Sequence, residues 1–192
     1  DLLTSVLGSF AGPLGSIAGG ILGGIVGKLF APKAQPGGVT VSVTGGEAGV
    51  SGTVGSDKSG ISAGNSLGGQ VASTVNQIVS QLGGTLGDFS VQIGKYKDDL
   101  RVNVKGKPLG GVKNGGATGF GDDQNAAVSF AAAQAIAQGA VQGVSAAVAN
   151  ALKSSTDVDK ALKEALKVQD LELTLGGIGA TGAGVDRHER FG

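Results

Sequence analysis

The sequence predicts an α+β fold with three parts: a Gly-rich apolar N-terminal helix, a small antiparallel β-hairpin region and Ala-rich C-terminal helices. Three observations support this division. Residues 2–27 carry no charge. Valines alternate with Thr and Ser over residues 39–44, the period of a half-buried strand. Residues 122–153 form an Ala-rich run with larger apolar residues at helical spacing.

Composition excludes several functional classes. Glycine fills 38 of the 192 positions, far above its usual share of about 7%. Cysteine is absent and His188 is the one histidine, which excludes disulfides and zinc–thiolate sites and argues against a Ser-His-Asp triad. Lys+Arg (15) and Asp+Glu (15) cancel, so no net charge attracts nucleic acid. The low charged fraction of 16% favours a surface that meets protein or lipid.

The first predicted unit, residues 1–36, contains rows of residues spaced by four. The glycine row is Gly15, Gly19, Gly23 and Gly27, and the isoleucine row is Ile17, Ile21 and Ile25. On a helix each row lies on one face, which gives the small-xxx-small pattern of close helix packing. So many glycines would destabilise a lone helix. We therefore expect residues 14–30 to form an oligomeric or transmembrane helix, a membrane-entering segment. Because the chain starts at Asp1 without a basic leader, we also expect it to be part of a longer protein.

The second predicted unit is residues 37–121, a small β/α region. Residues 39–43 predict a strand, Gly45-Gly46 a turn, and residues 50–54 a returning strand. We predict that the Gly/Ser-rich residues 55–66 form a loop.

Two further elements are expected within this unit. Apolar residues between Val71 and Leu82 have helical spacing, so residues 67–82 predict an amphipathic helix that ends at Gly83-Gly84. The alternating runs 89–93 and 100–104 predict a hairpin.

The third predicted unit, residues 122–170, is a helical module. Asp122 and Asp123 open a helix that we expect to reach about residue 153, with Phe130 as a large side chain and Gly139 and Gly143 on a close-packing face. Thr156 and Asp159 fit a capping box before a second helix to about residue 168, which has Leu162 and Leu166 on one face. Residues 171–192 are expected to be a short strand-like run and a Gly-rich tail.

Few residues suggest a catalytic or ligand-binding site, and each of these candidates also has a simpler structural interpretation. Gly177 to Gly182 match G-x-G-x-x-G, but the helix and acidic residue that a dinucleotide site needs do not follow. Asp122, Asp123 and Asn125 could bind a metal, although a helix cap is favoured. His188 with Asp186 and Glu189 is expected to be solvent-exposed. We predict no enzymatic activity, no cofactor and no metal site.

Basic residues gather around the predicted hairpin. They are Lys95, Lys97, Arg101, Lys105, Lys107 and Lys113. Such a group could contact DNA phosphates, but only Phe89 and Tyr96 are nearby aromatics, so base stacking has little support. A solvated sheet face is the favoured interpretation.

The order of these pieces resembles the C-terminal region of tail length tape measure proteins of long-tailed bacteriophages. "GSIAGGILGGIVGKLF" precedes "GVTVSVTGG", and "LGGTLGDFSVQIGKYKDDLRVNVKG" follows. The most specific parts are "FGDDQNAAVSFA" and "SSTDVDKALKEAL". The resemblance covers roughly residues 14–170. The tail after Leu171 departs from the family pattern, and the long helical ruler is absent from this chain.

The resemblance implies a structural virion protein in the tail lumen near the tip. It implies a homo-oligomer, a trimer at the tip, with the tail hub and tube proteins as partners and viral DNA nearby. Residues 120–166 would bind the tip. The apolar segment, with Gly15, Gly19, Gly23 and Gly27, would enter the host inner membrane during DNA ejection. The alternative is a secreted pore-forming or bacteriocin-like protein, which would use the same helix without partners. A nucleotide-binding module at Gly177–Gly182 is the third hypothesis.

Overall fold

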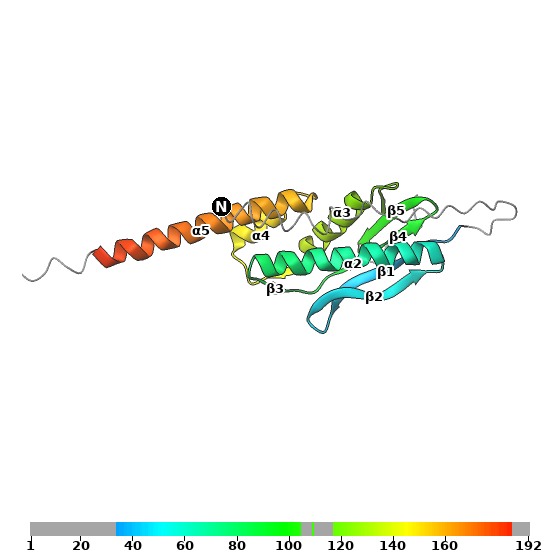
Figure 1. The fold of residues 1–192 in the computed structure, drawn as a ribbon, viewed down its shortest axis with the longest axis horizontal. Coiled ribbons are helices and arrows are strands. Elements are labelled where there is room, and N and C mark those ends of the chain that lie inside the picture. The colour runs from blue at the N-terminus through cyan, green and yellow to red at the C-terminus, as the bar shows by residue number, and fades with distance from the viewer. Residues whose placement is uncertain (1–33, 105–108, 110–116, 186–192) are drawn as a thin grey trace, which may run out of the picture.

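An antiparallel sheet with helices on one face forms the body of the protein, and a long helix extends from one end (Figure 1). The computed structural model describes residues 34–104, 109 and 117–185. The elements in chain order are β1 (Gly37–Thr44), β2 (Glu47–Gly55), α2 (Lys58–Gln81), β3 (Thr85–Leu86), β4 (Ser90–Tyr96), β5 (Asp99–Val104), β6 (Thr118–Gly119), α3 (Gln124–Ala137), β7 (Val141–Gln142), α4 (Ala146–Leu152) and α5 (Val158–Val185).

Among the described residues, the main sheet has five strands in the order β2-β1-β4-β5-β6, with antiparallel neighbours, and β3 pairs separately with β7. Both predicted hairpins are confirmed: β1 and β2 turn at Gly45-Gly46, and β4 and β5 turn at Lys97 and Asp98. The predicted small hairpin region is wrong, because β4 also pairs with β1 and joins the hairpins into one sheet.

The predicted fold also needs correction at its Gly-rich apolar N-terminal helix. Its residues, from Gly15 and Ile17 to Ile25 and Gly27, lie outside the described part of the chain. Within the described residues, no helix has both the length and the apolar character needed to cross a bilayer. The α+β class is correct, but the described architecture is a helix-covered sheet without a helix of transmembrane type.

Helix α2 begins at Lys58, so the predicted loop over residues 55–66 is wrong. Asp57 caps the helix and accepts a hydrogen bond from the Gly60 N–H (2.6 Å). At the other end, Gly83 has φ +65°, and the N–H of Gly84 donates to the Val79 carbonyl (2.9 Å). This is a Schellman motif, which confirms the predicted glycine cap.

The Ala-rich run does not form one helix as predicted. Gly139 (φ +101°) and Gly143 (φ +73°) adopt backbone conformations that other residues rarely take. They flank β7 and separate α3 from α4. These two glycines therefore lie in turns, and the helical close-packing face expected of them is absent.

The core joins the sheet to α2, α3 and the first half of α5. Val39, Val91 and Ile93 of the sheet are fully buried under Val71 and Ile78 of α2. The core side of α3 is mostly alanine, which brings the helix backbone close to the sheet. Those residues are Ala127, Ala131, Ala132 and Ala135, each with 0% exposure.

Candidate functional site

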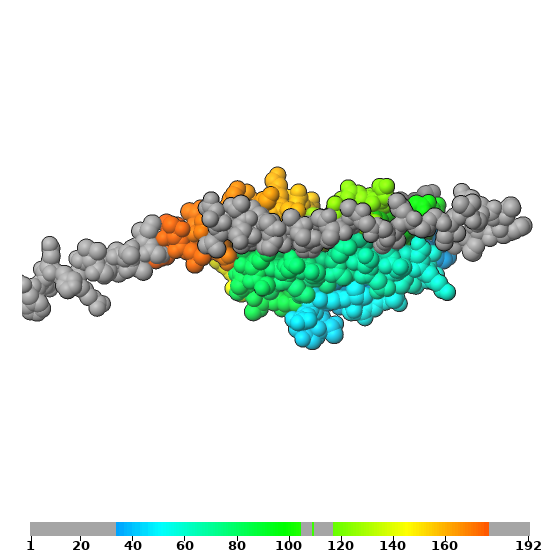
Figure 2. Space-filling model, in the orientation of Figure 1, coloured from blue at the N-terminus to red at the C-terminus, as the bar shows by residue number. Residues whose placement is uncertain are grey.

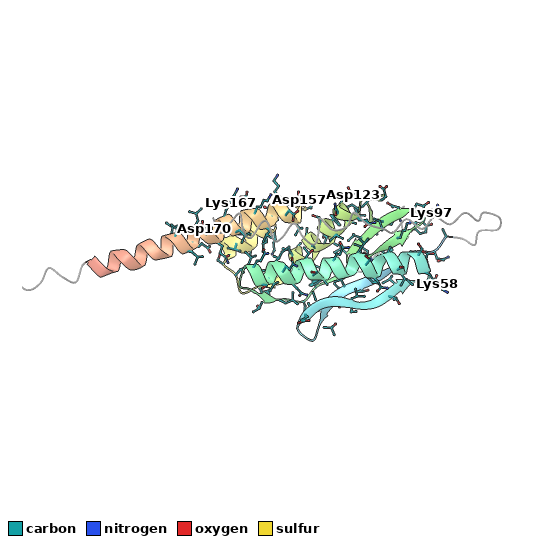
Figure 3. All side chains as sticks on the ribbon, in the orientation of Figure 1. Lys58, Lys97, Asp123, Asp157, Lys167 and Asp170 are labelled. Atoms are coloured by element: carbon teal, nitrogen blue, oxygen red, sulfur yellow. The ribbon has the colours of Figure 1, made fainter. Side chains whose placement is uncertain are left out.

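Helix α5 is fixed to the body at its N-terminal end. The Asp157 carboxylate accepts hydrogen bonds from the N–H groups of Asp159 (3.1 Å) and Lys160 (3.2 Å), so Asp157 caps the helix in place of the predicted Thr156. The Val158 N–H donates to the Ser129 hydroxyl of α3 (3.0 Å). Figure 3 labels Asp157 at the start of α5 and Asp123, the cap of α3.

One face of the first half of α5 is buried. Leu162 has 0% exposure, and Leu166 packs against the core from a half-buried position. These two residues therefore lie on one helix face, as the sequence predicts, and that face holds α5 on the body.

A groove of about 430 Å³ separates the start of α5 from α3. Phe120 and Phe130 line it, with ring centroids 5.2 Å apart. Asp159 also lines it, and one of its oxygens has no hydrogen-bond partner among the described residues. Burial raises the pKa of the Asp159 carboxyl above its ordinary value, and the neighbouring Asp157 charge adds to this effect.

Two acidic residues act as helix caps: Asp157 at the start of α5 and Asp123 at the start of α3. Asp123 accepts a hydrogen bond from the Ala126 N–H (3.0 Å), as the sequence predicts, and Asp122 lies in the turn before it. In the part of the chain that the structure describes, no three acidic, His or Cys side chains gather as a metal site would require.

The second half of α5 leaves the body of the protein. Gln169 donates to the Leu82 carbonyl (2.9 Å), and Ser145 donates to the Glu172 carboxylate (2.6 Å). Beyond these anchors the helix extends away from the other described elements (Figure 1). The predicted strand-like run and tail over residues 171–185 are therefore wrong, since these residues continue α5.

The projecting segment, residues 171–185, carries exposed apolar side chains among its residues 171–176. Leu171, Leu173 and Leu175 are 60%, 72% and 63% exposed, and residues 173–185 contain no charged residue. Leucine side chains on a helix of a folded protein normally face the core. This segment is thus suited to contact another protein surface. Sequence reasoning missed it because the spacing of these leucines by two favours a strand.

The structure does not support the other candidate binding sites suggested by the sequence. Gly177–Gly182 lie inside helix α5, whereas a dinucleotide fingerprint needs a turn between a strand and a helix. Arg101 is buried at 7% exposure and pairs with Asp99 (2.7 Å), so it is not available to phosphate. Lys105, Lys107, Lys113, Asp186, His188 and Glu189 lie outside the described residues.

Comparison with family models, with curated proteins and with solved structures finds no match for this chain. The functional assignment therefore depends on the residues and their arrangement.

Proposed function

We propose that this chain is a non-enzymatic structural component of a phage tail, the C-terminal part of a tape measure protein. The observation that supports the proposal best is the projecting segment of α5, with its three exposed leucines. Large exposed apolar patches are typical of protein–protein interaction sites. The order of sequence motifs described above supports the same assignment.

In this proposal the sheet and helices form the folded module, and the projecting segment is the docking element. Leu171 and Leu175 are separated by one helical turn and lie on one face. They would pack against the tail hub or against other copies of α5 in a trimer at the tail tip. A balanced net charge is compatible with a lumen shared with DNA, because strong positive charge would hold the DNA back.

The pore-forming alternative gains no support from the described residues. It rests on residues 14–30, which lie outside them. Entry into the host membrane stays a prediction for the same reason.

The test is the double variant Leu171→Gln with Leu175→Gln, introduced into the phage or prophage that encodes the chain. Both side chains are mostly exposed, so the folded module should be unchanged. We expect the variant protein to be lost from purified tails, and infectious particles to fall at least tenfold. Glu164→Gln with Lys167→Gln is the matched control, because it changes an exposed ion pair (3.2 Å) on the same helix. Normal incorporation and infectivity of the leucine variant would contradict the docking role. Absence of the unmodified, wild-type chain from purified tails would overturn the assignment itself.

A further inference from the structure

The outer edge of β2 is an open sheet edge in the described part of the structure. Among the described strands, β2 is last in the sheet order and has β1 as its one partner. The direction of backbone N–H and C=O groups alternates along an antiparallel strand. The groups of Ala48 point away from β1, since the Asn76 side chain bonds both of them. The groups of Val50, two residues further, therefore point outward as well.

The contact at Ala48 shows which chemical group this edge accepts. The Ala48 N–H donates to Oδ1 of Asn76 (3.1 Å), and Nδ2 of Asn76 donates to the Ala48 carbonyl (3.1 Å). A primary amide offers the same donor and acceptor as a peptide group. The side chain thus occupies the place of one peptide group of an added strand, and Val50 is the next residue whose groups point outward. The regular alternation ends after Val50, because the β1–β2 register shifts there and leaves Ser51 as an extra residue.

A groove of about 520 Å³ lies between this edge and α2. It is lined by Ala48, Gly49, Val50, Gly69, Ala72, Ser73, Asn76, Gln77 and Ser80. None of these side chains is ionisable, and α2 carries no charge from Ser59 to Gln81. Val50, at 39% exposure, is the one large apolar side chain outside α5 that is exposed among the described residues. Figure 2 shows the surfaces of α2 and β2 bordering each other.

We propose that this edge and groove bind an extended, uncharged segment of a partner protein by β-strand addition. The segment would bond the outward N–H and C=O of Val50 and place alternate side chains along α2. We expect the occupant to be uncharged, because none of the side chains that line the groove offers a charged group an ionic partner. The small residues Gly69, Ala72 and Ser73 leave room for its side chains. This inference does not depend on the phage-tail assignment, because it concerns a different surface from α5.

The test uses the full chain and a synthetic peptide, GVTVSVT, as the probe. The peptide copies residues 38–44 of β1, so it is uncharged and alternates in polarity, and in the folded chain these residues pair with the inner edge of β2. We expect millimolar peptide to slow amide hydrogen exchange at Val50 at least tenfold. GVKVKVT, with two charges, should give no protection.

Two pairs of variants locate the binding. Val50→Pro removes the outward donor, whereas Val50→Thr keeps it with a similar shape, so only Val50→Thr should retain binding. Ser73→Lys places a charge on the exposed wall of the groove without changing the strand, and Ser66→Lys is its control on an exposed position of α2 outside the groove. We expect Ser73→Lys to weaken binding at least tenfold. Absence of protection with the neutral peptide would overturn the proposal. Protection of Val50 in a dimer without peptide would overturn it in favour of a second copy as the occupant.

Discussion

Gly64 of α2 lies directly over Gly38 of β1. A Cβ atom on Gly64 would stand 2.9 Å from the Gly38 Cα and 2.8 Å from the Ile93 carbonyl oxygen, closer than side chains approach backbone. One turn before, Gly60 contacts Gly37, and one turn after, Gly68 meets Val39. Three glycines spaced by four thus bring the helix backbone against the sheet backbone.

Gly64→Ala should therefore destabilise the protein. The added methyl meets backbone atoms that cannot rotate away, and overpacking of this kind costs about 1–3 kcal/mol. Gly69→Ala is the control in the same helix, where an added Cβ has no atom within 4 Å. It should stabilise by about 0.5–1 kcal/mol through helix propensity. Urea unfolding of both variants measures the difference, and equal effects would show that the close approach has no energetic role.

This contact explains where the sequence prediction succeeded and where it was wrong. Strands β1, β2, β4 and β5 and the cap at Gly83 follow from local alternation and turn residues, and all are present. The start of α2 was missed because Gly60, Gly64 and Gly68 lower helix propensity locally. Their role depends on Gly37 and Gly38, which lie far away in sequence. The contact between these glycines and β1, which local sequence does not show, therefore decides where α2 begins.

At the candidate site, too, only features that depend on local sequence could be predicted. The cap Asp123 and the buried face with Leu162 and Leu166 could be predicted, because capping and helical period are local. Gly139 breaks the Ala-rich helix through its φ of +101°, and spacing alone could not show that. Leu171 to Leu175 continue α5, which is anchored to the body by Gln169 and Glu172.

Thr74→Val should stabilise the protein. Thr74 is fully buried in α2, and its hydroxyl has no hydrogen-bond partner among the described residues. Valine has nearly the same shape and removes the polar group, so the desolvation cost of about 1–3 kcal/mol is relieved. Thermal and urea unfolding would measure the gain. Thr74→Ala is the comparison, since it removes the hydroxyl but leaves a cavity. A loss of stability in Thr74→Val would indicate that the hydroxyl has a partner.

Gln138→Ala should weaken the attachment of α3 to the sheet. The Gln138 side chain accepts from the Ser90 N–H (2.9 Å) and donates to the Ser90 carbonyl (3.0 Å), at the start of β4. Each hydrogen bond contributes about 0.5–1.5 kcal/mol, so we expect a loss of roughly 1–3 kcal/mol by urea unfolding. Gln138→Glu keeps an acceptor but no donor and should give an intermediate loss. The reverse order of the two variants would refute this interpretation.

Asp99 should contribute stability that is lost in acid. Burial alone would raise its pKa, but the hydrogen bond and charge of Arg101 and the Gly121 N–H hold the pKa of Asp99 below its ordinary value of 3.8. Because the folded-state pKa is the lower one, the contribution is present above pH 3.8 and disappears as the pH falls through the folded value. The stability difference between wild type and Asp99→Asn should therefore be larger at pH 6 than at pH 2.5. Urea unfolding at both pH values measures it, and a constant difference would exclude the proposed ionic contribution.

Asp157→Ala should loosen the base of α5. It removes the acceptor for the N–H groups of Asp159 and Lys160, and loss of an N-cap costs about 0.5–2 kcal/mol. Asp157→Asn keeps a capping oxygen and should stay close to wild type, which separates the cap from the charge. Hydrogen exchange of the Val158–Leu162 amides should rise in Asp157→Ala alone. Because this turn fixes the helix that ends in Leu171, Leu173 and Leu175, the same variant should also weaken any contact that those leucines make. Unchanged exchange in Asp157→Ala would mean that the Ser129 contact holds the helix start without the cap.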